Sequence, residues 1–158
     1  MPRFVVVLPL VPLAEGDEFT VADWPLHVTL VEPFQSDLAG EAVARILDGV
    51  EGIGSGGSPI RAAAGDEAMF GRRRDVPVTL VHDGGELAAL RASTVHALAA
   101  AGIEVRARLE FRPHVTRKHH GGLRPGDPAV LDTVALIDMR PPEGAHHRRV
   151  VRAWHPGA

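Results

Sequence analysis

Short apolar runs separated by glycine and proline follow one another along most of the chain. Residues 3–8 (RFVVVL) are largely β-branched or aromatic, and they predict a buried first strand. A connection broken by proline and glycine covers 9–25. The next run, 26–31 (LHVTLV), predicts a second strand. Strands of this length and composition indicate a sheet as the main framework of the protein.

Two stretches instead place apolar residues at helical spacing. The first helix is expected at about 37–49, where Ser36 or Asp37 is in position to cap its N-terminus. The second is expected at about 85–101, with leucine, valine and alanine along one face and Gly102 in position to cap its C-terminus.

The middle of the chain predicts more strands. Residues 59–70 and 75–82 are typical of a hairpin around a tip at 71–75. Residues 103–110 are expected to begin another strand, and 111–118 (FRPHVTRK) to form a further one.

The chain ends in a loop and a second hairpin. Glycine and proline make 119–128 a loop, and 130–139 pairs in the prediction with 147–155. The expected order is β-β-α-β-β-α-β-β-β, which we interpret as a single domain over residues 1–158.

Within the predicted strands one tripeptide occurs twice, as His27-Val28-Thr29 and as His114-Val115-Thr116. About half of the 158-residue chain lies between the two copies. From the numbers of His, Val and Thr in the chain, chance predicts on the order of 0.04 such tripeptides. The repetition is therefore a specific signal, and it indicates two similar halves.

The spacing of this motif has a chemical meaning. Side chains at positions i and i+2 of a strand point the same way, so His27, Thr29 and Val31 are expected on one face. Two such strands beside one cleft would gather two imidazoles and two hydroxyls. Phosphodiester hydrolysis needs one group to accept a proton and another to donate one, and histidine suits both tasks near neutral pH. The hydroxyls can hydrogen-bond the phosphate oxygens.

Paired His-x-Thr motifs of this kind resemble those of the 2H phosphoesterases, a family also called 2′-5′ RNA ligases. The resemblance covers most of the chain in element order, and its specific part is the two motifs. It implies an α+β fold of two lobes related by a pseudo-twofold axis, with antiparallel sheets flanking a central cleft and helices outside. It also implies a metal-independent cyclic phosphodiesterase that uses no cofactor. Such an enzyme opens 2′,3′-cyclic phosphates of RNA ends or nucleotides to 2′-phosphates.

The same resemblance implies roles for the motif residues. His114 would activate water, His27 would protonate the departing 3′ oxygen, and Thr29 and Thr116 would hold the phosphate. The pseudo-symmetry leaves the two histidines interchangeable as acid and base. The same groups can also run the reaction in reverse, as 2′-5′ ligation.

The second motif departs from the family pattern just after its threonine. The family has an apolar residue there, which Leu30 matches and Arg117 does not. A strand that continues would set Lys118 on the face of His114, which makes Lys118 a candidate phosphate contact. Arg117 becomes a candidate if a local bulge turns it toward the cleft.

Other candidate contacts come from the predicted hairpin and from the few aromatic residues. The basic run 72–74, with Arg72 first, is a candidate for contacting RNA phosphates, and a solvated hairpin tip is the alternative. Phe70, Trp24 and Phe34 are candidates for stacking on a base, with core packing as the alternative.

Doubled histidines at 119–120 and 146–147 invite a metal interpretation. No accompanying ligand spacing supports it, so we expect exposed loop histidines and no metal.

Composition narrows the partners. The chain has no cysteine, which excludes thiol nucleophiles and thiolate metal sites and favours the cytoplasm. A net charge of −3 argues against wrapping a long nucleic acid but allows contact with an RNA 3′ end or a cyclic nucleotide. No apolar run approaches the roughly 20 residues of a membrane span, and a monomer is expected.

Two other classes of function stay open. One is a non-catalytic module that binds RNA ends or nucleotides in the same cleft. The other is an interaction or metal-storage domain, which only the loop histidines favour.

Overall fold

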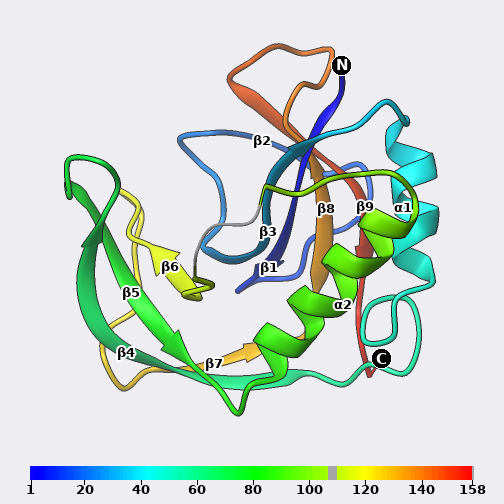
Figure 1. The fold of residues 1–158 in the computed structure, drawn as a ribbon. Coiled ribbons are helices and arrows are strands. Elements are labelled where there is room, and N and C mark those ends of the chain that lie inside the picture. The colour runs from blue at the N-terminus through cyan, green and yellow to red at the C-terminus, as the bar shows by residue number, and fades with distance from the viewer. Residues whose placement is uncertain (107–109, 158) are drawn as a thin grey trace.

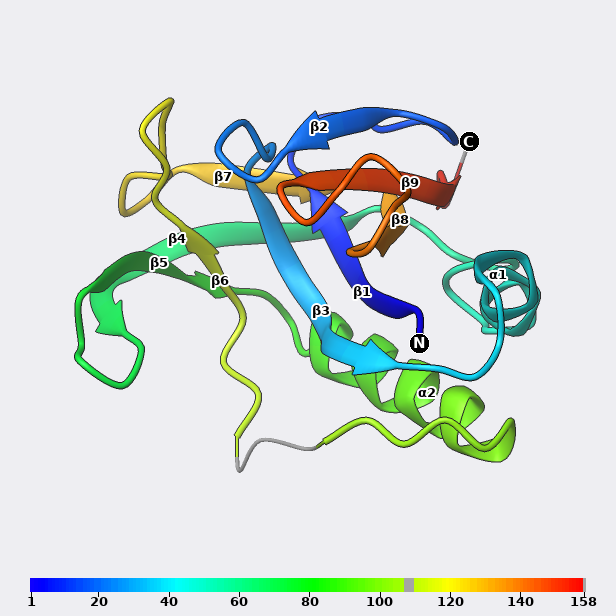
Figure 2. The ribbon, with the colours of Figure 1, turned by 90° about the horizontal axis from the view of Figure 1, so that it is seen from above.

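The computed structural model of the protein describes residues 1–106 and 110–157. The described strands form one nine-stranded sheet in the order β2-β9-β8-β1-β3-β6-β5-β4-β7, and every neighbouring pair is antiparallel. The sheet curls into a half-barrel, as Figures 1 and 2 show from two directions.

The strands, in chain order, are β1 Arg3–Pro9, β2 Glu18–Thr20, β3 His27–Gln35, β4 Ile60–Phe70, β5 Val76–His82, β6 His114–Thr116, β7 Pro128–Leu131, β8 Val134–Asp138 and β9 His147–Trp154. The helices are α1 Gly40–Asp48, between β3 and β4, and α2 Glu86–Ala100, between β5 and β6.

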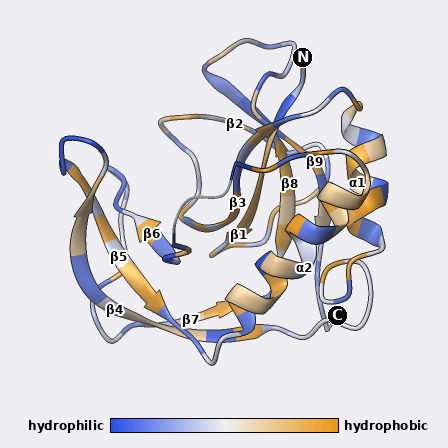
Figure 3. Ribbon diagram, in the orientation of Figure 1, coloured by the Kyte–Doolittle hydropathy of each residue, from blue (hydrophilic) through white to orange (hydrophobic). Residues whose placement is uncertain are grey.

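Strand β1 separates two apolar clusters because its side chains alternate between the two faces of the sheet. Phe4, Val6 and Leu8 point into the larger cluster, which we call the helix-side core. Val5 and Val7 point into a smaller cluster on the other face, which we call the second core. All five are almost fully buried, as expected of a strand with neighbours on both sides. Figure 3 shows the hydrophobic colour on the central strands and the hydrophilic colour at the β4–β5 tip.

Both helices contribute to the helix-side core, so both cover the same face of the sheet. Their buried apolar residues are Val43, Ala44 and Leu47 from α1 and Leu87, Leu90 and Leu98 from α2.

The two halves of the sheet meet where β3 pairs with β6. Val28 of β3 lies opposite Val115 of β6 in antiparallel register, and both valines are buried in the helix-side core. On its other edge β6 pairs with β5, with Thr79 opposite Val115. The short strand β6 therefore joins the hairpin of β4 and β5 to the rest of the sheet.

Beside β1, strand β3 contains a β-bulge. Val6 pairs with Val31 and Val7 pairs with Thr29, so Leu30 is an extra residue in β3. Leu30 and Val31 are consequently both buried in the helix-side core. The expectation that Val31 shares a face with Thr29 is wrong, because simple alternation does not continue through a bulge.

Most of the expected elements are present, some with shifted ends. The first strand, the β4–β5 hairpin and α2 lie where the sequence pattern predicts them. Helix α1 begins at Gly40, about a turn later than expected, and its N-cap Ala39 makes no side-chain hydrogen bond. The expected cap is wrong because Ser36 Oγ accepts a hydrogen bond from Leu38 N in a local turn outside the helix.

Four stretches of the chain differ from the expected strands. Strand β2 lies inside the stretch 9–25 that was expected to be a connection, and three residue pairs with β9 hold it in the sheet. The expected strand 130–139 is split in two: β7 pairs with β4 at the far edge of the sheet, whereas β8 pairs with β1 and β9. The strand expected at 111–118 is reduced to the three residues of β6. Of the expected strand at 103–110, residues 103–106 form no strand and residues 107–109 lie outside the described residues.

The fold class is α+β, as expected. One continuous sheet takes the place of the separate sheets expected on either side of a cleft, because β3 and β6 hydrogen-bond to each other. The division into two lobes about a pseudo-twofold axis stays a prediction. No helix among the described residues is both long enough and apolar enough to cross a membrane.

We expect Val115→Ala to lower the free energy of unfolding by about 2 kcal/mol, since it removes two buried methyl groups and leaves a cavity at the β3–β6 junction. Val130→Ala is the matched control, because Val130 is 45% exposed on the edge strand β7. It should change the free energy by no more than about 0.5 kcal/mol. Denaturant unfolding measures both, and equal losses would contradict a structural junction at Val115.

Candidate functional site

Four polar side chains meet at the junction of β3 and β6. The central valines of the two motifs pair in antiparallel register, and one step to either side this register sets His27 beside Thr116 and Thr29 beside His114. All four are half-buried. They lie on the sheet face opposite the helix-side core, because the valines between them point into that core. The junction thus brings together two imidazoles and two hydroxyls from distant parts of the chain.

Both imidazoles are held by the same backbone contact. His27 Nδ1 lies 2.8 Å from the carbonyl oxygen of Pro25, and His114 Nδ1 lies 2.8 Å from that of Arg112. A carbonyl oxygen only accepts, so each ring holds a hydrogen on Nδ1. The other ring nitrogen, Nε2, is then the atom through which each histidine can exchange a proton with a substrate.

The imidazole of His27 packs against an aromatic ring. Its ring stacks on Trp24, with centroids 4.6 Å apart and planes inclined by 25°. Burial lowers the pKa of His27 from 6.5 to about 4. The hydrogen bond to Pro25 opposes this shift, and the positive charges of Lys118 and His114 add to it. His27 is therefore uncharged at neutral pH.

His114 has a different aromatic neighbour. Phe70, at the end of β4, meets its ring edge-on, with centroids 4.6 Å apart and planes at 68°. The guanidinium carbon of Arg112 lies 4.9 Å from the centroid of the Phe70 ring. The second motif thus carries an aromatic ring and a cation beside its histidine, as the first does, but in edge contact rather than in a stack.

A cavity of about 440 Å³ opens beside His114. Thr29 and His114 line it, whereas His27 and Thr116 are not among its described wall residues. The rest of the described wall comes from the end of β3, the β4–β5 tip, α2 and residues 110–112. Small-molecule sites are typically roughly 300–1,000 Å³, so the cavity is large enough for a ligand of nucleotide size.

An ion pair of Glu32 and Arg91 forms one side of this cavity. Arg91 Nη1 donates to Glu32 Oε2 at 2.9 Å, and Nη2 donates to Oε1 at 2.8 Å. Arg91 Nη1 also donates to the carbonyl of Leu30, and its guanidinium carbon lies 5.2 Å from the Phe111 ring centroid. The two side chains are only 13% and 17% exposed. A forked pair with this little solvent forms a rigid part of the wall.

The two candidate phosphate contacts that follow the second motif, Lys118 and Arg117, lie in different places. Lys118 is half-buried, and its ammonium nitrogen lies 5.9 Å from the Trp24 ring centroid, on the His27 side. Arg117 is exposed and forms an ion pair with Glu67 of β4 at 3.3 Å. Strand β6 ends before both residues. The structure therefore brings Lys118 near the histidines and directs Arg117 to the neighbouring hairpin.

Of the candidate contacts on the β4–β5 hairpin, one lies on the cavity wall and one does not. Phe70 lies on the cavity wall, in contact with His114. Arg72 is exposed at the tip and is not among the described wall residues, whereas Arg74 is. A contact between any of these residues and a substrate stays a prediction.

For two of the aromatic candidates the core-packing alternative is correct. Trp24 is 9% exposed and belongs to the second core, and Phe34 is 4% exposed in the helix-side core. Neither ring is open to a base.

The doubled histidines form no common site. His119 Nε2 lies 3.8 Å from Asp23 Oδ1, and His120 Nε2 lies within hydrogen-bond distance of the Trp24 carbonyl, at 3.1 Å. Within residues 1–106 and 110–157, no group of three or more His, Asp or Glu side chains is arranged to hold a metal ion.

Sequence reasoning missed Glu32, Arg91 and Arg112. Arg112 had a local signal, because it stands two residues before His114, as Pro25 does before His27. Glu32 and Arg91 had none. They are 59 residues apart, and only the packing of α2 against β3 brings them together.

Comparison with known proteins supports this arrangement at the level of family and fold. A family model described as the 2′-5′ RNA ligase superfamily matches residues 13–152. A search of curated proteins found no significant match.

Solved structures with the same fold include E. coli LigT complexed with 3′-AMP, with 15% identity, full coverage of both chains and a TM-score of 0.62. A structure described as a phosphoesterase has 16% identity, full coverage of both chains and a TM-score of 0.63. TT0787 of Thermus thermophilus has 18% identity, covers 99% of this chain and 98% of its own, and has a TM-score of 0.59. At these identities the similarity concerns the fold alone.

We expect Glu32→Gln to lower the free energy of unfolding by about 2 kcal/mol, because it leaves the Arg91 guanidinium without its counter-charge in a poorly hydrated wall. Glu67→Gln breaks the exposed pair with Arg117 and is the matched control, with an expected loss of no more than about 0.5 kcal/mol. Denaturant unfolding at moderate salt compares the two variants. Similar small losses in both would contradict a structural role for the Glu32–Arg91 pair.

Proposed function

The chain belongs to the 2′-5′ RNA ligase superfamily, and on that premise we propose that it opens 2′,3′-cyclic phosphates to 2′-phosphates. The substrates are RNA 3′ ends or nucleotides. One observation carries the proposal: two His-x-Thr motifs from opposite halves of the sequence lie on neighbouring strands with their polar side chains on one face. Two imidazoles are what an acid–base phosphodiester hydrolysis requires, whereas binding alone requires neither.

The proposed reaction begins at His27. A water oxygen forms a bond to phosphorus while a water proton passes to Nε2 of His27. The bond from phosphorus to the 3′ oxygen breaks, and His114, which at this stage holds a hydrogen on both ring nitrogens, gives its Nε2 proton to that oxygen. Thr29 and Thr116 donate hydrogen bonds to the non-bridging phosphate oxygens, which carry the developing negative charge. Both proton transfers use side chains of this chain, so the proposed route needs no metal ion.

This assignment of base and acid is the reverse of the one that the family resemblance implies. The reason lies in the surroundings of His27. Burial lowers its pKa to about 4, so at neutral pH its Nε2 offers a lone pair and is ready to accept a proton.

The cavity next to His114 is proposed to hold the organic part of the substrate. Phe70 offers an aromatic face or edge to a base, and Arg74 and Arg112 offer positive charge to further phosphates. E. coli LigT, which shares the fold, has been crystallised with 3′-AMP, ATP and NADP⁺, which supports a nucleotide-type ligand. In this proposal Lys118 adds positive charge near the phosphate, and Arg72 contacts only the phosphates of a longer RNA strand.

We expect the purified protein to convert 2′,3′-cyclic nucleotides, and short RNA with a cyclic phosphate end, to 2′-phosphates in the presence of EDTA. His27→Ala and His114→Ala should each reduce kcat/KM by about 10² to 10⁴, because each removes one proton transfer. Chromatography of the products identifies the 2′-phosphate, and titration with a nucleotide tests whether binding persists in the variants.

His119→Ala is the matched control, because His119 is an exposed loop histidine, and it should stay within about twofold of wild type. Turnover by both histidine variants at the wild-type rate would overturn the proposal. Binding without turnover in the wild type would favour the binding-module alternative.

The pH dependence tests whether turnover requires an uncharged His27. With His27 as the base, kcat/KM should decline as the pH falls from about 5 toward 4, where His27 becomes protonated. Activity that stays level or rises between about pH 5 and pH 4 would contradict an uncharged His27 as the base. Circular dichroism at each pH value separates titration from unfolding.

A further inference from the structure

Trp24 lies in a layered arrangement that ends at His27. Its ring stacks on the imidazole on one side, and the guanidinium carbon of Arg148 lies 5.4 Å from its ring centroid. We propose that Trp24 is a positioning residue, whose flat face fixes the plane of the His27 ring and keeps water from it. This inference rests on the proposed function for its catalytic meaning, but the geometry that it assigns to His27 is measurable without any substrate.

The cation of this arrangement is firmly anchored. Arg148 Nη1 donates to the carbonyl oxygens of Met139, Ala145 and His147, at 3.2, 3.0 and 2.9 Å. These carbonyls belong to the loop between β8 and β9 and to the first residue of β9. The guanidinium therefore stays in place beside Trp24.

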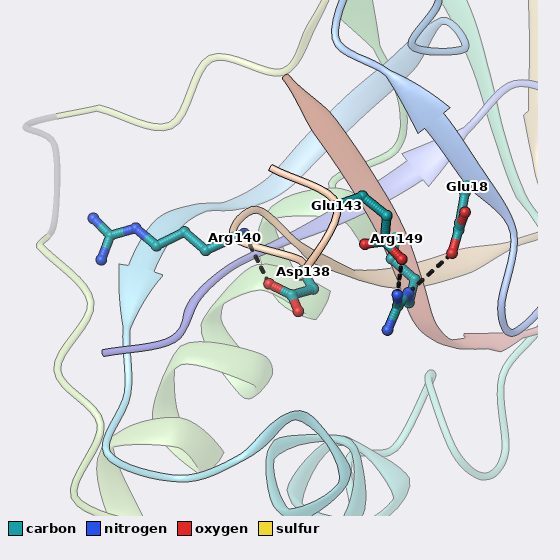
Figure 4. Close-up of polar contacts among 5 residues, drawn as sticks. All are labelled: Glu18, Asp138, Arg140, Glu143 and Arg149. Atoms are coloured by element: carbon teal, nitrogen blue, oxygen red, sulfur yellow. Dashed lines mark hydrogen bonds and ion pairs between the residues drawn. The ribbon is translucent and has the colours of Figure 1, made fainter. Parts of the chain in front are cut away.

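The next residue along β9 holds the same loop to the sheet. Arg149 forms ion pairs with Glu143 of the loop and with Glu18 of β2, which Figure 4 shows on either side of its guanidinium. In the same loop the Arg140 backbone N–H donates to Asp138 Oδ1 at 2.8 Å. The support behind Arg148 is thus tied to both neighbouring strands.

The backbone of Trp24 is also held. Trp24 N donates to the carbonyl of Val21, and the Trp24 carbonyl lies 3.1 Å from His120 Nε2 in the loop that follows β6. Phe19 packs against the Trp24 ring with centroids 5.8 Å apart. Contacts from residues 19–21 and from His120 therefore hold Trp24 in place.

Two buried polar atoms make the arrangement unusual. Among the described residues, the buried side-chain atoms without a hydrogen-bond partner are Trp24 Nε1 and Arg148 Nε. Leaving a buried donor without a partner costs roughly 1–3 kcal/mol, so packing alone would favour a ring without an N–H at position 24. Unfavourable local arrangements of this kind are concentrated at functional sites. The contribution of Trp24 to His27 comes from the ring face and not from its N–H.

The consequence for His27 follows from two constraints. The hydrogen bond from Nδ1 to Pro25 fixes one edge of the ring, and the Trp24 face prevents rotation out of plane. Nε2 then has a fixed direction, and a misplacement of about 1 Å of a reacting group typically costs on the order of 10² in rate. The same face removes solvent from the imidazole, which is the largest cause of the lowered pKa of His27.

At His114 the aromatic contact has a different geometry, since Phe70 touches that ring edge-on and a cavity opens beside it. Trp24 thereby distinguishes two motifs that are otherwise alike in sequence and in backbone contact.

The test compares three variants with wild type. Trp24→Leu removes the flat face, and Trp24→Phe keeps a flat face without the indole N–H. Trp154→Leu is the matched control, because Trp154 is also 9% exposed and donates to Asp48 Oδ1, in the helix-side core. Trp24→Met fills a similar volume without a flat ring and replaces Trp24→Leu if the latter does not fold.

The first readout is the titration of His27 by NMR in the folded protein, which needs no activity. Trp24→Leu should raise the pKa of His27 from about 4 toward 6.5 by at least about one unit, whereas Trp24→Phe and Trp154→Leu should leave it close to the wild-type value. The second readout is turnover of a 2′,3′-cyclic nucleotide. Trp24→Leu should lower kcat by about 10 to 100-fold with little change in KM, and Trp24→Phe should retain most of the activity.

An unchanged His27 titration in folded Trp24→Leu would overturn the inference, as would an equal shift in Trp154→Leu. A pKa of His27 that rises in Trp24→Phe as it does in Trp24→Leu would also overturn it, because the indole N–H and not the flat face would then be responsible. If wild type turns over no cyclic phosphate, the proposed function fails, while the titration still decides the positioning role.

Discussion

The pairing of β3 with β6 through Val28 and Val115 is the contact on which the rest of the structure depends. It joins the two halves of the sheet, and its valines connect both halves to one core under the helices. Because side chains alternate along a strand, burying these valines necessarily turns their neighbours to the other face. The strand pairing that stabilises the sheet therefore also assembles the candidate site. A slip of one residue in either strand would turn the histidine of that strand toward the core and its valine away from it.

Two like motifs in unlike surroundings can divide a reaction between them. Each histidine donates to a backbone carbonyl two residues earlier, so both rings hold a hydrogen on Nδ1. Their aromatic neighbours then differ, since Trp24 stacks on His27 whereas Phe70 meets His114 edge-on beside a cavity. The uncharged imidazole of His27, packed against an indole ring, and the imidazole of His114, which faces a cavity, suit different roles in proton transfer. The asymmetry that the proposed acid–base catalysis needs is supplied by neighbours and not by the motif itself.

Arginine side chains near the candidate site are paired locally with a carboxylate or with backbone carbonyls. The Glu32–Arg91 pair satisfies both members with forked hydrogen bonds in a poorly hydrated wall, and Arg148 donates to three carbonyls. Pairing of this kind lets cations lie close to a site without an excess of positive charge over the whole chain, whose net charge is −3. It is consistent with a ligand that presents one or a few phosphates.

The sequence alone determined the elements with strong periodicity and the two motifs. Valine runs, helical spacing and a repeated His-Val-Thr are local signals, so β1, the β4–β5 hairpin, α2 and the candidate histidines were predictable. Short segments such as β2, and the separation of β7 from β8, depended on partners far away in sequence. The bulge at Leu30, the Glu32–Arg91 pair and the stack on His27 were likewise decided only by tertiary structure. A contact between residues dozens of positions apart leaves no period in the sequence, because packing geometry and not local propensity determines it.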